Sequence, residues 1–251
     1  MGQAEISSVI LGDSTSPTVL ILHGWGHSIE VTRGLGELLS ASFCVHLLDL
    51  PGHGKSPIPD SVWSMEDFAL AVKRYLDSHS LKNAFFVGHS FGGKTSLKLA
   101  SIFPEAISKL VLINSSGIKP NRPFKKKARM KYIAFLRSVL KFMDKFIGTE
   151  TFKNWFVPKF ASPDYLNAGP MRAIFVKTVN EDLTQEISNI KLPVLLLWGE
   201  IDTETPLEMG RRMNDLIKGS KLIVLPNMDH VPFLGSGMHA CAYQIAKFFR
   251  E

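Results

Sequence analysis

The residues with the clearest chemical potential lie in FFVGHSFGGKTS, residues 85–96, where an apolar run ends at a serine flanked by glycines. A strand that turns sharply into a helix brings its backbone close to its neighbours, so only small side chains fit two positions before and after the corner. Gly88 and Gly92 meet that demand around Ser90. The corner would hold the Ser90 hydroxyl at a helix N-terminus, where backbone N–H groups stabilise an anion. The GxSxG spacing also arises by chance, so its place between an apolar run and a helical pattern is what indicates a nucleophile.

A serine hydroxyl becomes a good nucleophile only when a base accepts its proton and a carboxylate orients that base. His230 directly follows the last apolar run of the chain, KLIVLPNM, in a loop that could reach Ser90. Asp202 follows the preceding run, LPVLLLWGE, in the same way. We therefore predict that Ser90, Asp202 and His230 form a catalytic triad. The other carboxylates that could orient the histidine are Glu200, Glu204 and Asp229.

Short apolar runs alternate with helix-like segments through most of the chain and must position these residues. The runs are aliphatic, β-branched or aromatic and end in turn residues, as strands buried on both faces of a sheet do. They lie at 19–24, 43–52, 83–90, 108–117, 192–200 and 221–228. Helical patterns lie at 65–80, 93–103 and 206–219, with another closing the chain. This alternation predicts an α/β protein with a mostly parallel, doubly wound sheet, whose ligands bind beyond the carboxyl ends of the strands.

One long segment, residues 117–190, has no strand-like run of the same quality. Its apolar residues recur instead at helical spacing, at Ile133, Leu136, Leu140, Met143 and Ile147. We predict a helical cap, or lid, inserted at 117–190 into a core formed by residues 1–116 and 191–251.

Positive charge is concentrated in the predicted cap. Residues 117–160 carry twelve Lys or Arg against Asp144 and Glu150, whereas the whole chain has a formal net charge of +6. One basic element on a near-neutral body argues against a nucleic-acid partner. The element could attract an anionic substrate, an acidic carrier protein or, transiently, an acidic membrane surface, or it could simply be a solvated outer face.

The motifs LHGWG, DLPGHGKS, VGHSFGG, WGEIDTETP and MDHVPF occur in this order along nearly the whole chain. Together they resemble the α/β-hydrolase superfamily, whose fold is the one predicted above. The resemblance implies that the turn at His23 and Gly24 presents the backbone N–H of Trp25, which forms an oxyanion hole with the N–H of Phe91. His23 is then a hydrogen-bonding residue of the turn rather than a catalyst. DLPGHGKS is interpreted as a structural loop, since it lacks the spacing of a phosphate-binding loop.

The chemistry implied by the resemblance is hydrolysis of a carboxylic ester or thioester through an acyl-enzyme. A serine at the corner disfavours the dehalogenases and epoxide hydrolases of this fold, which place aspartate there. Carbon–carbon bond hydrolysis, amide cleavage and non-catalytic ligand binding on the same fold are the alternatives. LHGWG, DLPG and HVPF also resemble, more loosely, the pimeloyl-carrier methyl esterases, whose substrate is attached to an acidic carrier.

The composition fits one large α/β domain, with 251 residues of which 45% are hydrophobic. Histidines, cysteines and carboxylates show no metal-ligand spacing, so we expect neither a metal nor another cofactor. Cys44 and Cys241 are interpreted as buried, unpaired hydrophobic residues, which suits a reducing compartment. The chain shows no targeting segment and no apolar stretch of membrane-spanning length, so we expect a cytoplasmic protein with no stable membrane insertion.

Overall fold

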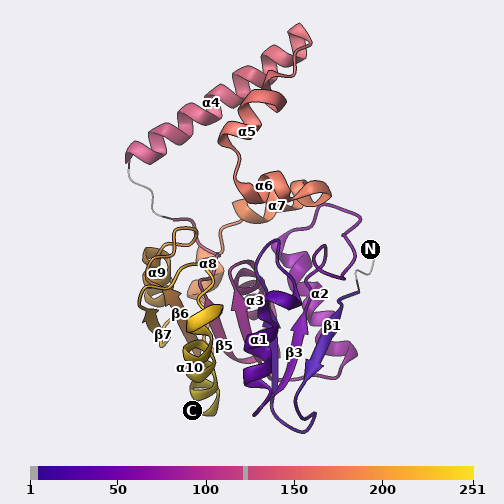
Figure 1. The fold of residues 1–251 in the computed structure, drawn as a ribbon, viewed down its shortest axis with the longest axis vertical. Helices are drawn as coiled ribbons and strands as arrows, with labels where there is room; N and C mark the ends of the chain where they lie inside the picture. Colours follow the sequence, from indigo (N-terminus) through magenta and orange to yellow (C-terminus); the bar gives the residue numbers. More distant parts are fainter. Residues whose placement is uncertain (1–4, 121–123) are drawn as a thin grey trace. The chain divides into compact units, whose positions relative to one another are not determined.

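The computed structural model describes residues 5–120 and 124–251, with residues 124–127 and 130 described by their backbone alone (Figure 1). The chain divides into two compact units. The core unit comprises Met1–Pro120 and Val176–Glu251, and the insertion unit comprises Asn121–Phe175. The insertion unit is shorter than the segment 117–190 expected from the sequence. Residues 176–190 pack with the core unit, in which Leu183 and Ile187 are buried.

The described part of the core unit contains a seven-stranded sheet in the order β1-β3-β2-β4-β5-β6-β7. β1 pairs with β3 in antiparallel fashion, and the other neighbouring strands are parallel. The strands are β1 (Ser8–Leu11), β2 (Thr18–Leu22), β3 (Cys44–Leu48), β4 (Ala84–His89), β5 (Ile107–Ile113), β6 (Val194–Gly199) and β7 (Lys221–Leu225). This confirms the predicted fold class and the six predicted strands. The edge strand β1 was not predicted, because its four residues are only partly buried and follow no long apolar run.

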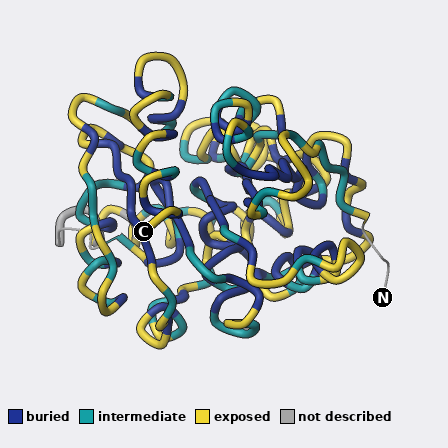
Figure 2. The backbone as a smooth tube through the Cα atoms, turned by 90° about the horizontal axis from the view of Figure 1, so that it is seen from below, coloured by how far each residue is buried: buried dark blue, intermediate teal, exposed yellow. Residues whose placement is uncertain are grey.

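Helices cover both faces of the sheet because its central strands are apolar on both sides. On one face, Val19, Ile21 and Leu47 pack with residues of α1 and α10 in a single apolar cluster. On the other face, α9 approaches β6 so closely that a Cβ at Gly210 would lie 2.6 Å from the Trp198 ring. Buried stretches, dark blue in Figure 2, alternate with exposed turns along the chain.

The helices of the core unit include the four predicted ones, near 65–80, 93–103, 206–219 and the end of the chain, and two, at 29–39 and 184–188, that have no counterpart among those patterns. They are α1 (Ile29–Leu39), α2 (Met65–Ser78), α3 (Phe91–Ile102), α8 (Thr184–Ser188), α9 (Leu207–Leu216) and α10 (Met238–Arg250), with short 3₁₀ turns η1 (Pro104–Ala106) and η4 (Gly235–Gly237). Cys44 lies in β3 and Cys241 in α10, and both are buried free thiols as expected.

The described residues of the insertion unit are helices and turns, without a strand, as the sequence predicted. The elements are α4 (Phe124–Ile147), the π-helical turn η2 (Phe152–Phe156), α5 (Val157–Phe160), α6 (Pro163–Asn167) and the 3₁₀ turn η3 (Gly169–Met171), while α7 (Arg172–Asn180) leads back into the core unit. The Asp144 carboxylate stabilises the turn after α4 by accepting hydrogen bonds from the backbone N–H groups of Thr151 and Phe152. Across the described residues, no helix is both long enough and apolar enough to span a membrane.

Lys94 on α3 joins this helix to the end of α7. Its side chain is buried, and its Nζ donates to the carbonyls of Thr178, at 2.7 Å, and Glu181, at 2.6 Å. Burial disfavours the charged ammonium and lowers the pKa of Lys94 to about 8, although the nearby Glu181 and Asp182 oppose this shift. The Lys94 ammonium is therefore a buried charge whose desolvation is offset only in part by the two carbonyls and the nearby carboxylates.

The lowered pKa of Lys94 predicts a pH-dependent contribution to stability. Between about pH 8 and 10.5 the unfolded chain holds a proton on Lys94 that the folded chain has lost, so the free energy of unfolding rises with pH across this window. In urea denaturation, the free energy of unfolding of the wild type should rise by on the order of 3 kcal/mol relative to that of Lys94→Met over this pH range. Lys98→Met, which removes a partly buried lysine one turn further along α3, is the control. Parallel pH profiles for the wild type and Lys94→Met would contradict the prediction.

Candidate active site

The corner between β4 and α3 is formed by Ser90, which has φ 48° and ψ −109°. A positive φ is strained for any residue with a side chain and costs on the order of 1–3 kcal/mol. The two flanking glycines make the corner possible. A Cβ at Gly88 would lie 2.6 Å from the Cα of Gly93, and a Cβ at Gly92 would lie 2.2 Å from the carbonyl oxygen of Leu22. Backbone contacts this close leave no room for larger side chains, which explains the glycine spacing.

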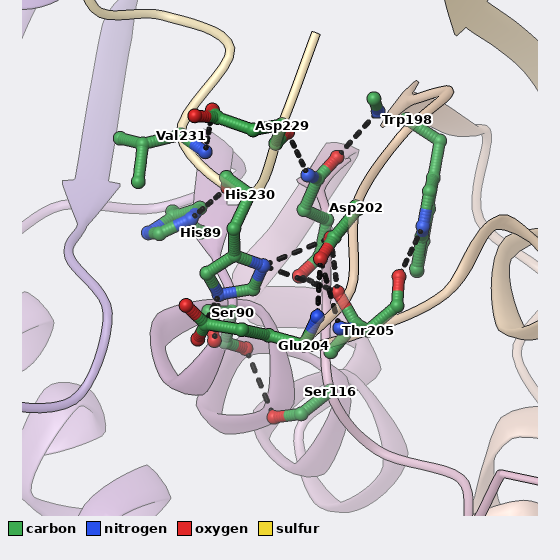
Figure 3. A network of polar contacts seen from close by, with 12 residues as sticks. His89, Ser90, Ser116, Trp198, Asp202, Glu204, Thr205, Asp229, His230 and Val231 are labelled. Carbon is green, nitrogen blue, oxygen red and sulfur yellow. Dashed lines mark hydrogen bonds and ion pairs between the residues drawn. The ribbon is translucent and has the colours of Figure 1, made fainter. Parts of the chain in front are cut away.

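The structure brings the three residues of the predicted triad together at the carboxyl ends of β4, β6 and β7 (Figure 3). His230 Nε2 lies 3.1 Å from Ser90 Oγ, and His230 Nδ1 lies 2.8 Å from Asp202 Oδ2. A neutral ring with its proton on Nδ1 donates to Asp202, and its unprotonated Nε2 can accept a proton from the serine. The arrangement has the geometry required to activate a serine hydroxyl.

The Asp202 carboxylate is surrounded by hydrogen-bond donors. Oδ1 accepts from the backbone N–H groups of Glu204, at 2.8 Å, and Thr205, at 3.0 Å. Oδ2 lies 2.7 Å from Thr205 Oγ1 and also contacts His230. Burial on its own raises the pKa of Asp202, but the hydrogen bonds from His230 and Thr205 outweigh burial and leave the pKa below its usual value. Asp202 is therefore ionised at neutral pH.

The three alternative carboxylates make other contacts. Glu200 accepts a hydrogen bond from the backbone N–H of Asn227, and Asp229 accepts one from the N–H of Val231. Glu204 does contact His230, but at Nε2 and not at Nδ1, with a distance of 3.4 Å. Of the four acidic residues considered from the sequence, Asp202 is the one placed on the nitrogen that an orienting carboxylate must contact.

Asn114, which the sequence analysis did not single out, connects the ends of β5 and β6 with the loop after β7. It follows β5 directly, with φ 43°, and is completely buried. Its Nδ2 donates to the carbonyl of Asp229, and its Oδ1 accepts from the N–H of Gly199 at the end of β6. The side chain thereby ties the loop that carries His230 to the strand that precedes Asp202. A polar residue at the end of an apolar run, as in LVLINSSG, was the available sequence signal.

His89 and Thr205 are further site residues that sequence reasoning missed. His89 is buried at the end of β4, and its Nε2 donates to the backbone carbonyl of His230 at 2.8 Å. Burial lowers the pKa of His89 to about 3, so its ring is neutral at physiological pH. The carbonyl of Thr205 accepts from Trp198 Nε1, which fixes the loop after β6. Residues that hold a catalytic loop by backbone contacts leave no recognisable spacing in a sequence.

The turn after β2 is fixed by His23. Its Nδ1 donates to the carbonyl of Gly24 at 2.7 Å, and its Nε2 accepts from the N–H of Leu50 at 3.0 Å. Burial lowers the pKa of His23 to about 3, which keeps the ring neutral and both hydrogen bonds intact. Next in the turn, the Trp25 ring packs edge-on against Phe91, with centroids 5.1 Å apart. The structure thus brings the two predicted oxyanion-hole residues side by side.

The DLPGHGKS loop is held by Asp49, a buried residue. Its carboxylate accepts hydrogen bonds from the N–H groups of Ile29, at 2.7 Å, and Lys55, at 2.8 Å. A Cβ at Gly54 would lie 2.2 Å from this carboxylate, and Gly54 has a φ of 53°. The loop therefore has a structural explanation. Among the described residues, no group of three or more His, Cys, Asp or Glu side chains is placed to hold a metal ion.

Comparison with known proteins identifies two family models that match this chain. Residues 17–154 match the model described as alpha/beta hydrolase fold, and residues 167–251 match the model described as TAP-like protein.

Solved structures with the same fold include several bacterial hydrolases. An esterase from Thermogutta terrifontis is 23% identical, with 98% of this chain and 93% of that chain covered and a TM-score of 0.73. An enol-lactonase from Burkholderia xenovorans LB400 is 22% identical, with coverages of 98% and 96% and a TM-score of 0.73. The meta-cleavage product hydrolase from Pseudomonas fluorescens IP01 is 19% identical, with coverages of 98% and 94% and a TM-score of 0.73. At these identities the likeness shows the fold alone.

Proposed function

Because the chain belongs to the α/β-hydrolase family, we propose that it hydrolyses carboxylic esters through an acyl-enzyme formed on Ser90. The observation that carries the proposal is the continuous chain of contacts from Ser90 Oγ through His230 to the ionised Asp202. Each contact lies within hydrogen-bonding distance, and the order of the residues along the chain is the one typical of this fold. Thioesters react by the same steps and belong to the same proposal.

In the first half of the reaction, Ser90 Oγ attacks the carbonyl carbon of the ester while His230 Nε2 accepts the hydroxyl proton. The electron pair of the carbonyl moves to its oxygen, which the backbone N–H groups of Trp25 and Phe91 stabilise in this proposal. The carbonyl then re-forms, the bond to the alcohol oxygen breaks, and Nε2 gives its proton to the departing alcohol. An acyl group remains on Ser90.

In the second half, His230 accepts a proton from water, and the resulting hydroxide attacks the acyl carbon. The acid leaves when the bond to Ser90 Oγ breaks and Nε2 returns the proton to Oγ. Throughout both halves, Asp202 holds the imidazole with its proton on Nδ1 and stabilises the transient imidazolium. No metal or other cofactor takes part in this scheme.

The role of Ser90 predicts a large loss of turnover in Ser90→Ala. The variant should fold normally, as judged by circular dichroism, and its kcat on p-nitrophenyl butyrate should fall at least about a thousandfold. Ser116→Ala is the matched control, because it removes a nearby hydroxyl that donates to the Ser90 carbonyl at 3.2 Å. A fluorophosphonate probe should label Ser90, as read by peptide mass spectrometry. Near-normal turnover in Ser90→Ala, or labelling of another residue, would contradict the proposal.

Asp202→Asn should lower kcat/KM by about ten-thousandfold, because an amide stabilises the wrong tautomer of His230. The lowered pKa of Asp202 keeps this carboxylate ionised well below neutral pH, so the rise of kcat/KM with pH should follow the loss of the imidazolium proton in a single step. Asp229→Asn preserves the acceptor for Val231 N–H and serves as the control. A loss below about tenfold in Asp202→Asn, with a larger loss in the control, would assign the orienting role to Asp229.

We further propose that the basic residues of 117–160 attract substrates whose acyl half is anionic or attached to an acidic carrier. Lys125, Lys126 and Lys127 belong to this segment, but their side chains lie outside the described ones. The motifs LHGWG, DLPG and HVPF loosely resemble those of the pimeloyl-carrier methyl esterases, whose substrate is attached to an acidic carrier, and this resemblance supports the proposal.

The charge proposal predicts that a methyl ester with a terminal carboxylate loses kcat/KM when the three lysines are changed to Ala. It should also lose kcat/KM in high salt, because screening weakens attraction between exposed charges. A methyl ester with a neutral acyl chain should change little. Changing three exposed lysines of the core unit, Lys82, Lys191 and Lys218, to Ala is the control for net charge. Equal rates for both esters under all conditions would leave the basic segment with a solvation role only.

A further inference from the structure

The carboxylate of Glu204 lies on the far side of the His230 ring from Asp202. Its Oε2 is 3.4 Å from His230 Nε2, the same nitrogen that lies 3.1 Å from Ser90 Oγ. Figure 3 shows the Glu204 side chain extending from the loop after β6 toward Ser90. The backbone of Glu204 is held in place by its N–H bond to Asp202 Oδ1, whereas its side chain is 65% exposed. A carboxylate with a fixed backbone thus stands beside the nucleophile and remains accessible to a bound molecule.

The negative charge of Glu204 has no matching cation among the described residues. No Lys or Arg in that part of the chain pairs with it, and the ring it contacts is neutral when His230 acts as a base. Among the described residues, the charged or titratable groups seen to contact this ring include Asp202 on Nδ1, Glu204 on Nε2, and the neutral His89, whose ring centroid lies 4.9 Å away. Asp202 is buried and saturated with donors, so Glu204 is the carboxylate here that a substrate can reach.

We propose that Glu204 selects the alcohol half of the substrate by charge, an inference that rests on the esterase function proposed above. The departing alcohol takes its proton from His230 Nε2, so its oxygen must pass next to this nitrogen and hence next to the Glu204 carboxylate. Alcohols that carry a positive charge close to the ester oxygen are favoured there. Alcohols that carry a carboxylate in the same place are disfavoured by repulsion and by the desolvation of two like charges.

Three butyrate esters of nearly equal shape test the proposal. Their alcohols are choline, the neutral isostere 3,3-dimethylbutan-1-ol, and 4-hydroxy-2,2-dimethylbutanoate, in which a carboxylate replaces one methyl group of the neutral alcohol. For the wild type at low salt, kcat/KM should decrease from the cationic to the neutral to the anionic ester. In Glu204→Gln the ratio of the cationic to the anionic ester should fall about tenfold, since exposed charge pairs change each rate only a few-fold.

The control is Glu200→Gln, which removes a carboxylate from the same loop but keeps the acceptor for Asn227 N–H. This variant should retain the wild-type ratio. A general structural disturbance in Glu204→Gln would lower all three rates together, whereas the proposal requires the rate on the anionic ester to rise relative to the neutral one. An unchanged ratio of cationic to anionic ester in Glu204→Gln overturns the proposal.

An NMR titration of the His230 ring separates this inference from the esterase function. A carboxylate near Nε2 favours the imidazolium, so Glu204→Gln should lower the midpoint of the titration by about half a pH unit. A wild type that cleaves none of the esters refutes the proposed function and with it the selection of the alcohol, whereas the titration still tests whether the Glu204 carboxylate acts on His230 Nε2. An unchanged midpoint refutes that role even if all three esters are cleaved.

Discussion

The hydrogen-bonded carboxylate of Asp202 is the interaction on which the rest of the candidate site depends. A buried charge is costly unless it is fully paired, and the loop after β6 satisfies Asp202 with two backbone N–H groups and the Thr205 hydroxyl. Asp202 Oδ2 also accepts a hydrogen bond from His230 Nδ1. This bond keeps the imidazole proton on Nδ1 and fixes the orientation of the ring. The direction of Nε2 toward Ser90 follows from these contacts.

The same loop explains why Glu204 is where it is. The backbone N–H of Glu204 donates to Asp202 Oδ1, which holds the backbone of Glu204 close to the triad carboxylate. From there the Glu204 side chain reaches His230 Nε2. Two carboxylates two residues apart therefore contact opposite nitrogens of one imidazole. The two carboxylates differ in environment, since Asp202 is enclosed by hydrogen-bond donors while Glu204 is exposed to solvent and to a bound molecule.

The fold could be predicted from the sequence because its strands are buried on both faces and read as continuous apolar runs. The same reasoning failed for β1, whose side chains are mostly half-buried at the edge of the sheet. The positions of Ser90, Asp202 and His230 could be predicted because each follows a strand and parallel strands end at the same edge. Asn114, Thr205 and His89 could not, because they contact residues that are distant in sequence, Asp229, Asn114 and His230 respectively.

The charges of the two parts of the chain act on a substrate in different ways. A cluster of lysines and arginines produces a field that extends over about a Debye length, roughly 8 Å at physiological salt, and so raises the rate of encounter with any anionic molecule. The single carboxylate of Glu204 acts over a few ångströms on the group next to His230 Nε2. Attraction of an anionic acyl half and rejection of an anionic alcohol are thus compatible, because the ester bond separates the two halves. Both requirements are met by an ester whose acyl half has a negative charge far from the ester bond and whose alcohol half is small and neutral or cationic. We therefore propose a methyl ester of a long acidic acyl chain as the substrate class that meets both proposed requirements.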